Sequence, residues 1–270
     1  MLKTRIITAL VLAVGMASLL FLEDSRWWQG LFLVAVFAMG YEWAGFAKIT
    51  QKTNKLIWGT SFSISVFALD FLLENSPVLN LLLILPLIIM VVIVVQFQRK
   101  QGQTFITNPL WLYFLGLIIV FPFYHAIISM KLAFSPSLIL LSFFTIWAID
   151  TGAYFSGKKF GKNKLASYVS PGKSWEGVYG GVILSFVIAY AGLIWIQPSV
   201  NVSYVTLAFM LGTIGALSVF GDLFESFLKR QVNMKDSSQI LPGHGGVLDR
   251  LDSIILAMPL YLLVWQMVII

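Results

Sequence analysis

The sequence predicts an all-α, polytopic integral membrane protein, and its composition and apolar runs are the basis for this. Of 270 residues, 59% are hydrophobic and only 11% are charged, and the mean hydropathy is +0.87. Uninterrupted apolar runs reach the roughly 20 residues that a helix needs to cross about 30 Å of hydrocarbon. The chain has no cysteine, which excludes disulfides, thiolate metal sites and thiol nucleophiles. Any metal must therefore be held by oxygen or histidine, which favours a hard cation such as magnesium.

About nine apolar transmembrane helices are predicted. In order, they cover residues 6–22, 27–47, 56–73, 78–97, 109–129, 136–155, 177–196, 203–224 and 251–269. Lys3 and Arg5 precede the first helix and no A-x-A-type cleavage site follows it, which indicates an uncleaved helix that begins inside the cell. Aromatic residues near the predicted helix ends are typical of interfacial belts, namely Trp27, Trp28, Trp111, Trp175 and Tyr204. We find no repeat and no soluble domain, so residues 1–270 are expected to form one transmembrane domain.

The positive charges predict the orientation of the chain, because Lys and Arg near helix ends are retained on the cytoplasmic side. With a cytoplasmic amino terminus, all 18 Lys and Arg residues except Arg26 and Lys131 fall in cytoplasmic segments. The net charge of +6 is then concentrated on one face, which suits anionic lipid headgroups or a soluble polyanion. We expect a multi-pass protein of the plasma membrane with its site on the cytoplasmic side, and no nucleic-acid partner.

Two predicted cytoplasmic segments, residues 156–176 and 225–250, are longer than most other connections. Long loops between packed elements are usually functional or disordered. These two carry glycine, proline and charged residues at specific offsets, unlike a low-complexity linker. We therefore expect the two long loops to form the functional site.

Four carboxylates approach the predicted cytoplasmic face. Asp150 lies in WAIDTGAYFSGKKFGKNK near the end of the sixth helix, and Asp222 lies in VFGDLFESFLKR near the end of the eighth. Asp249 and Asp252, three residues apart, share one face at the start of the ninth helix. A carboxylate on the apolar side of an interface is costly unless it is paired or hydrated. Either Asp150 and Asp222 pair with loop lysines while the other two are helix-terminal acids, or the four hold a cation.

The run KDSSQILPGHGGVLDRLDS, which begins at Lys235, favours the second interpretation. The glycines around His244 let backbone N–H groups approach a phosphate at a helix N-terminus. Carboxylates for a divalent cation, glycines for close approach, and Lys or Arg for the remaining charge are the components of a metal–nucleotide site. We expect His244 to contact phosphate or orient a neighbour, and His125 to be a packed or interfacial residue.

The segment SPGKSWEG, residues 170–177, resembles the end of a Walker A loop. Ser167 replaces the first glycine and no parallel sheet is predicted, so we reject a P-loop. Lys173 either contacts phosphate or extends to the membrane surface from the start of the seventh helix. Glu176 is either a metal ligand or an ordinary first-turn acid. Glu42, near the end of the second helix, is expected to pair with Lys48 or another lysine.

The spacing of residues from 226 to 252 resembles the signature of the phosphatidate cytidylyltransferases, the CDP-diacylglycerol synthases. The matching positions are Ser226, Leu228, Lys229, Arg230, Lys235, Asp236, Ser238, Pro242, His244, Gly245, Gly246, Asp249, Arg250 and Asp252. The upstream blocks DTGAYFSGKKFGKNKL and SPGKSWEG are also similar to that family, with Ser174 where a threonine is common. Motif resemblance covers residues 147–177 and 218–253, and elsewhere only hydropathy and length agree.

This resemblance implies an enzyme of phospholipid biosynthesis that transfers CMP from CTP to phosphatidate, with Mg²⁺, and yields CDP-diacylglycerol and pyrophosphate. It leaves open a second cation and a homodimer. Residues 1–135 would supply the N-terminal helices and residues 136–270 the catalytic helices and loops. With the chemistry above, it assigns Asp222, Asp249 and Asp150 to metal; Asp222, Asp249, Lys229, Arg230 and Arg250 to catalysis; and Lys173, Lys235, Asp236, His244, Gly245, Gly246 and Asp252 to substrate binding.

Two rival functions remain at this point. A CTP-dependent lipid kinase would use a similar site but would transfer the γ-phosphate and release CDP. A transporter would use intramembrane acids near the midplane, in related halves of the chain. Here the acids gather at one face and no two halves look alike, which favours chemistry at the interface. A CDP-alcohol phosphotransferase is disfavoured because its D-G-x-x-A-R pattern is missing.

Overall fold

The computed structural model describes residues 2–103 and 106–270, and it describes their side chains except for residues 2–10 and 12. The side chains of Lys3 and Arg5 therefore lie outside the described set. The described elements are α1 (Leu2–Phe21), α2 (Ser25–Phe46), α3 (Lys52–Leu73), α4 (Leu79–Arg99), α5 (Pro109–Ala133), α6 (Pro136–Phe160), β1 (Lys164–Ala166), β2 (Ser170–Ser174), α7 (Trp175–Ile196), α8 (Tyr204–Gln231) and α9 (Leu248–Val268). The all-α prediction is confirmed, since each predicted helix corresponds to one of these.

Some helices begin at a residue whose side chain caps them, namely α2, α5, α7 and α8. The Asp24 carboxylate accepts a hydrogen bond from the backbone N–H of Arg26 at the start of α2, and Asn108 caps α5 next to Pro109. At the cytoplasmic ends predicted above, α6 and α8 continue beyond their apolar runs. In α8, Glu225 and Lys229 pair one turn apart, which extends the helix through residues expected in a loop.

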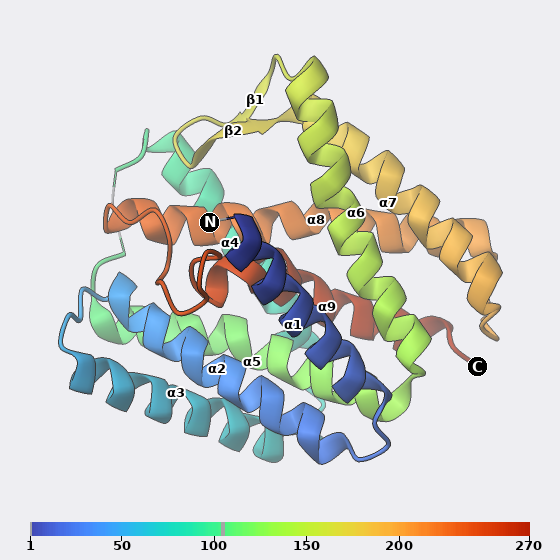
Figure 1. Ribbon diagram of the computed structural model, residues 1–270, viewed down its shortest axis with the longest axis horizontal. Helices are drawn as coiled ribbons and strands as arrows, with labels where there is room; N and C mark the ends of the chain where they lie inside the picture. Colours follow the sequence, from blue (N-terminus) through green and yellow to red (C-terminus); the bar gives the residue numbers. More distant parts are fainter. Residues whose placement is uncertain (1, 104–105) are drawn as a thin grey trace.

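Within the described part of the chain, seven helices, α3 to α9, are long and apolar enough to cross a membrane. This confirms a polytopic membrane protein, while the crossing of α1 and α2 stays a prediction. The connections alternate between two ends of the molecule. In Figure 1 the α2–α3 and α8–α9 connections lie at the left, and the α7–α8 connection and the carboxyl terminus lie at the right. Such alternation is expected of a chain that crosses repeatedly; which end faces the cytoplasm stays a prediction.

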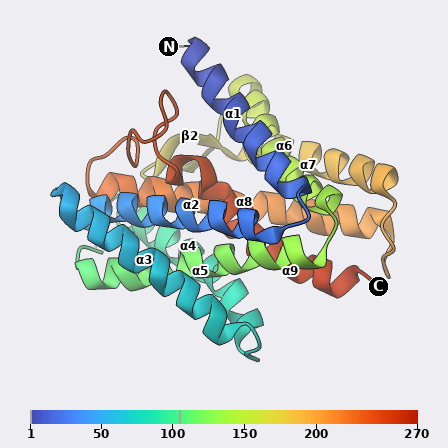
Figure 2. The same cartoon turned by 60° about the horizontal axis from the view of Figure 1, so that its bottom comes forward.

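The core is centred on α5, α8 and α9, whose side chains are buried along most of their length. By contrast, only 17% of the most apolar stretch of α3 is buried, so this helix presents most of its surface outward. Figure 2 shows α1 extending away from α2. Trp28 was predicted to be interfacial, and that is wrong: it is fully buried in the core, where its indole N–H donates to the Ile127 carbonyl at 3.1 Å. Trp27 and Trp111 are exposed, as a belt requires.

The α6–α7 pair supports the site. A Cβ added at Gly152 of α6 would lie 2.7 Å from the Gly180 carbonyl oxygen and 2.8 Å from the Gly181 Cα of α7. Small residues at this crossing therefore let the two backbones approach closely. Between the helices, β1 and β2 form an antiparallel hairpin, so the described residues around SPGKSWEG contain no parallel sheet and agree with the rejection of a P-loop.

Candidate active site

A cavity of about 650 Å³ with many charged side chains in its lining opens where α6, α7, α8, α9 and β2 meet. Its size is typical of a small-molecule site. Most of the charged residues predicted for the site line it: Asp150, Lys173, Asp222, Lys229, Asp236, Asp249, Arg250 and Asp252. Four different elements thus bring together residues that are up to about a hundred positions apart in the chain.

One wall of the cavity carries three carboxylates and a lysine. Lys173, on β2, forms an ion pair with Asp222 of α8, with 2.5 Å between Nζ and Oδ2. The Ser226 hydroxyl donates to the other Asp222 oxygen at 3.3 Å. Asp150 and Asp252 lie close enough to Asp222 and Lys173 for their charges to interact. Lys173 is therefore a residue of the site rather than one that only extends to the membrane surface.

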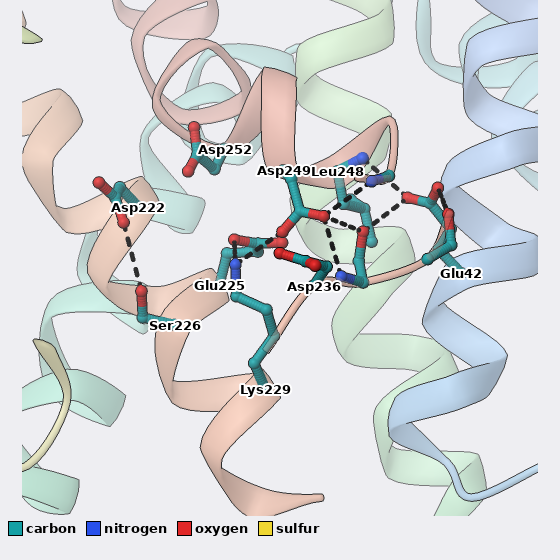
Figure 3. Close-up of polar contacts among 12 residues, drawn as sticks. Glu42, Asp222, Glu225, Ser226, Lys229, Asp236, Leu248, Asp249 and Asp252 are labelled. Atoms are coloured by element: carbon teal, nitrogen blue, oxygen red, sulfur yellow. Dashed lines mark hydrogen bonds and ion pairs between the residues drawn. The ribbon is translucent and has the colours of Figure 1, made fainter. Parts of the chain in front are cut away.

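The other wall is organised by Lys229. Its Nζ lies 2.5 Å from Glu225 Oε2 and 2.7 Å from Asp249 Oδ1, so one ammonium group joins α8 to α9 (Figure 3). The second Asp249 oxygen, Oδ2, accepts hydrogen bonds from the backbone N–H groups of Ser237 and Gly246, at 2.9 and 2.8 Å. Asp249 thus meets the cavity through one oxygen and holds the α8–α9 connection through the other.

The expected phosphate cradle at the start of α9 is wrong for this structure, because protein carboxylates already accept from its N–H groups. Gly246 donates to Asp249, and Val247 and Leu248 each donate to Glu42 of α2 at 2.8 Å. Glu42 was expected to pair with Lys48 or another lysine, but it is 1% exposed and forms no ion pair among the described residues.

Five predicted residues do not line the cavity: Arg230, Lys235, His244, Gly245 and Gly246. Arg230, next to the last residue of α8, and Lys235, in the connection that follows, are both exposed to solvent. His244 lies in a turn in which its backbone N–H donates to Leu241, and its buried Nδ1 has no hydrogen-bond partner within the described part of the chain. None of the five lines the cavity, so their roles in catalysis and substrate binding stay predictions.

Glu176 takes the second of its two proposed roles. Its carboxylate accepts from the backbone N–H groups of Lys162 and Asn163 and from the Asn163 side-chain amide, at 2.7 to 3.2 Å. It lies outside the cavity lining. Glu176 therefore holds the turn after α6 onto the start of α7, and this fixes the hairpin that carries Lys173.

The cavity has the donor chemistry of a Mg²⁺ site, since carboxylate oxygens are the ligands that Mg²⁺ prefers. Asp150, Asp222, Asp249 and Asp252 all line it. Within the described residues, however, no group of three or more His, Cys, Asp or Glu side chains is already gathered closely enough to hold a metal ion. Lys173 neutralises Asp222 instead. The residues fit a hard divalent cation by chemistry, and binding would require Lys173 to move away from Asp222.

Comparison with known families decides what kind of protein carries this cavity. The model of a family described as "Cytidylyltransferase family" matches residues 3–268. The chain belongs to the cytidylyltransferase family.

Among curated relatives, the phosphatidate cytidylyltransferase of Pseudomonas aeruginosa is 38% identical over 270 residues, covering 97% of this chain and 96% of the relative. That of Haemophilus influenzae is 35% identical over 282 residues, covering 97% of each chain. That of Staphylococcus aureus strain COL is 45% identical over 125 residues, covering 45% of this chain and 46% of the relative.

Sequence reasoning did not find the roles of three residues around the cavity of this cytidylyltransferase-family protein. Glu225 is 4% exposed and binds Lys229, Glu42 binds the start of α9, and the Ser237 hydroxyl lies between Glu42 and Asp249. The two glutamates had a usable signal, because a carboxylate inside an apolar helix is costly unless a partner satisfies it. Ser237 had none, since serine is common in polar loops.

Proposed function

We propose that this chain transfers CMP from CTP to phosphatidate, which gives CDP-diacylglycerol and pyrophosphate. The observation that carries the proposal is the cavity lined by acidic and basic side chains at the ends of apolar helices, in a chain that matches the cytidylyltransferase family over residues 3–268. A polar site at that level lets a soluble nucleotide meet a lipid whose acyl chains remain in the bilayer. The full-length relatives that carry the name phosphatidate cytidylyltransferase support the same conclusion.

The reaction is a nucleotidyl transfer. A phosphate oxygen of phosphatidate attacks the α-phosphorus of CTP, a P–O bond forms there, and the bond to pyrophosphate breaks. The second pKa of a phosphate monoester is about 6, so the nucleophile is mostly a dianion at neutral pH and needs no strong general base. The obstacle is repulsion between two polyanions. Catalysis is therefore expected to consist of alignment and charge neutralisation.

The basic residues of the cavity supply that neutralisation from the protein. Lys173 now pairs with Asp222, and Lys229 pairs with both Glu225 and Asp249, so each lysine would leave a carboxylate to meet phosphate, whereas Arg250 lines the same cavity and forms no ion pair among the described residues. When bound, Mg²⁺ would neutralise phosphate charge and align the two substrates. We propose Asp150, Asp222 and Asp249 as its ligands, with Asp252 adjacent, and keep Asp236 as a substrate contact. No step is derived for Arg230, Lys235 and His244, because none of the three lines the cavity.

The location of the reaction is part of the proposal. We place the cavity on the cytoplasmic side of a plasma membrane, because the basic residues gather in the connections at that end and CTP is a soluble cytoplasmic substrate. A homodimer is retained as a family-level expectation.

The test is to incubate purified protein with phosphatidate, Mg²⁺ and CTP labelled separately at the α and γ positions. We expect the α label in the lipid product and the γ label in pyrophosphate. The γ label in lipid would mean that the protein is a lipid kinase. If neither label appears in lipid, in a folded sample supplied with lipid, nucleotidyl transfer is rejected and a transport function is favoured.

A further inference from the structure

We propose that Glu42, on α2, is a positioning residue for Asp249: it holds the Ser237–Ser238 turn and the start of α9 and thereby orients Asp249 at the cavity. The inference rests on the proposed function for its catalytic consequence. Its structural part stands on the contacts of Glu42, which lies in the N-terminal half of the chain, far in sequence from every other residue of the site.

Glu42 is a fully engaged acceptor. Its Oε1 accepts from the Ser238 hydroxyl at 2.6 Å and from the Val247 N–H at 2.8 Å. Its Oε2 accepts from the Ser237 hydroxyl at 3.1 Å and from the Leu248 N–H at 2.8 Å. Figure 3 shows these bonds converging from the α8–α9 connection onto α2. Each oxygen therefore accepts one hydroxyl and one backbone N–H.

These bonds replace a missing cap. The first N–H groups of a helix have no partner within the helix, and Val247, at the N-cap of α9, makes no side-chain capping bond. Glu42 supplies the acceptor from another helix, and its negative charge also suits the positive end of the α9 dipole. The capped turn is the one that carries Asp249, so the position of Glu42 fixes the direction in which Asp249 leaves the backbone.

Ser237 connects the two acids directly. Its hydroxyl lies 3.1 Å from Glu42 Oε2 and 2.9 Å from Asp249 Oδ2. A hydroxyl has one hydrogen, so both carboxylates share a single donor and neither can shift without changing the bond of the other. The loop is closely packed here. A Cβ added at Gly246 would lie 2.6 Å from Glu42 Oε1 and would overlap the Ser237 hydroxyl.

Glutamine is the informative replacement because it has the shape of glutamate. Its amide NH₂ would face either the Val247 or the Leu248 N–H, so two donors would meet where a donor and an acceptor meet now. Glu42→Gln is therefore expected to release the α8–α9 connection without leaving a cavity. Ser237→Ala removes only the hydroxyl between Glu42 and Asp249, and Glu74→Gln, at the exposed far end of α3, is the matched control.

The experiment measures CMP transfer from α-labelled CTP together with amide hydrogen exchange in the same detergent. For Glu42→Gln we expect roughly tenfold or greater loss of kcat/KM and a rise of about threefold in the Mg²⁺ concentration for half-maximal rate. If Glu42→Gln only reduced the fraction of folded enzyme, the rate would fall but the Mg²⁺ concentration for half-maximal rate would not change. Exchange at Ser237, Gly246, Val247 and Leu248 should be about tenfold faster, with α5 protected as in the wild type. Ser237→Ala should show the same effects more weakly, and Glu74→Gln none.

The outcomes separate the two proposals. Suppose that the wild type transfers CMP. If Glu42→Gln then leaves hydrogen exchange in the loop unchanged, or keeps activity within about twofold of the wild type, the positioning role is overturned and the proposed function stands. If Glu42→Gln does not fold, Ser237→Ala decides by the same two readouts. A wild type that transfers no CMP rejects the proposed function, while hydrogen exchange still tests whether Glu42 holds the loop.

Discussion

Asp249 uses its two oxygens for different tasks. Oδ1 meets the Lys229 ammonium at 2.7 Å beside the cavity, and Oδ2 accepts two backbone N–H groups of the α8–α9 connection. Hydrogen bonds to an ionised carboxylate are about twice as strong as neutral ones. The charge of Asp249 therefore both orders the loop and sets the position of Lys229.

Asp249→Asn is expected to abolish CMP transfer, with a loss of roughly a hundredfold or more, because an amide neither holds Lys229 by charge nor offers a cation a charged oxygen. The variant should elute as the wild type does in size-exclusion chromatography. Asp24→Asn is the control. Hydrogen bonds from Arg26 lower the pKa of Asp24 to about 2, so this variant also removes a full negative charge, but at the α1–α2 turn. Activity of Asp249→Asn within a few-fold of Asp24→Asn would contradict the metal assignment.

At the residue scale, the sequence predicts the members of the cavity better than their partners. Asp150, Asp222 and Asp252 were identified because each lies in or next to an apolar run at a predicted helix end, where a charge requires a reason. Glu42 has the same signal, but its partners are 195 or more positions away. Local spacing cannot select such partners, so a nearby lysine was chosen instead.

At the scale of elements, the crossing of α6 and α7 determines how Asp150 and Lys173 lie relative to each other on one wall of the cavity. Asp150 lies on α6 two residues before Gly152, and Lys173 lies on the strand that leads into α7. The glycines bring the two helices together, and Glu176 ties the intervening turn to α7. The spacing of the two helices therefore sets the width of this side of the cavity.

Gly152→Val is expected to separate α6 from α7, because its side chain would overlap the α7 backbone. Overpacking of this kind costs about 1–3 kcal/mol, so both the thermal midpoint in detergent and the CMP transfer rate should fall. Gly30→Ala, in α2, is the matched control, because a Cβ there meets nothing within 4 Å and alanine is the better helix former. Equal midpoints and rates for the two variants would show that the close approach is not required.

Helix boundaries show why the sequence predicts elements only in part. Apolar runs locate all nine helices among the described residues, but α6 and α8 continue into polar sequence. In α8 the extended end carries Lys229, which pairs with Glu225 one turn earlier in the same helix and with Asp249 of α9, a tertiary contact. An apolar run stops where the chain leaves the membrane, whereas a helix stops where its last backbone groups find other hydrogen-bond partners.

At the scale of the whole molecule, the alternating connections and the uneven distribution of Lys and Arg make one orientation testable. The hairpin around Lys164 and the α7–α8 connection around Ser199 are exposed and lie on opposite sides of the predicted membrane. The sequence predicts this arrangement from the apolar runs together with the positions of Lys and Arg. The tilt of each helix could not be predicted, because it depends on the packing of side chains between helices.

The absence of cysteine provides a clean background for that test. Lys164→Cys and Ser199→Cys should each give a single labelling site for a membrane-impermeant maleimide in intact cells. We expect Ser199→Cys to be labelled from outside and Lys164→Cys only after permeabilisation, because basic segments stay cytoplasmic. The reverse pattern would place the cavity on the outer side and exclude access of cytoplasmic CTP.

The bond between α2 and the start of α9 also constrains the order in which the protein can be completed. Ribosomes synthesise α2 long before the four residues that donate to Glu42, so Glu42 has none of these partners while α2 is being inserted; they are Ser237, Ser238, Val247 and Leu248. A carboxylate near the end of an apolar helix is costly until it is satisfied. Before α9 is inserted, the inserted helices therefore have a higher free energy because the Glu42 carboxylate is unsatisfied. Contact of the start of α9 with α2 satisfies Glu42 in the same step that assembles the cavity.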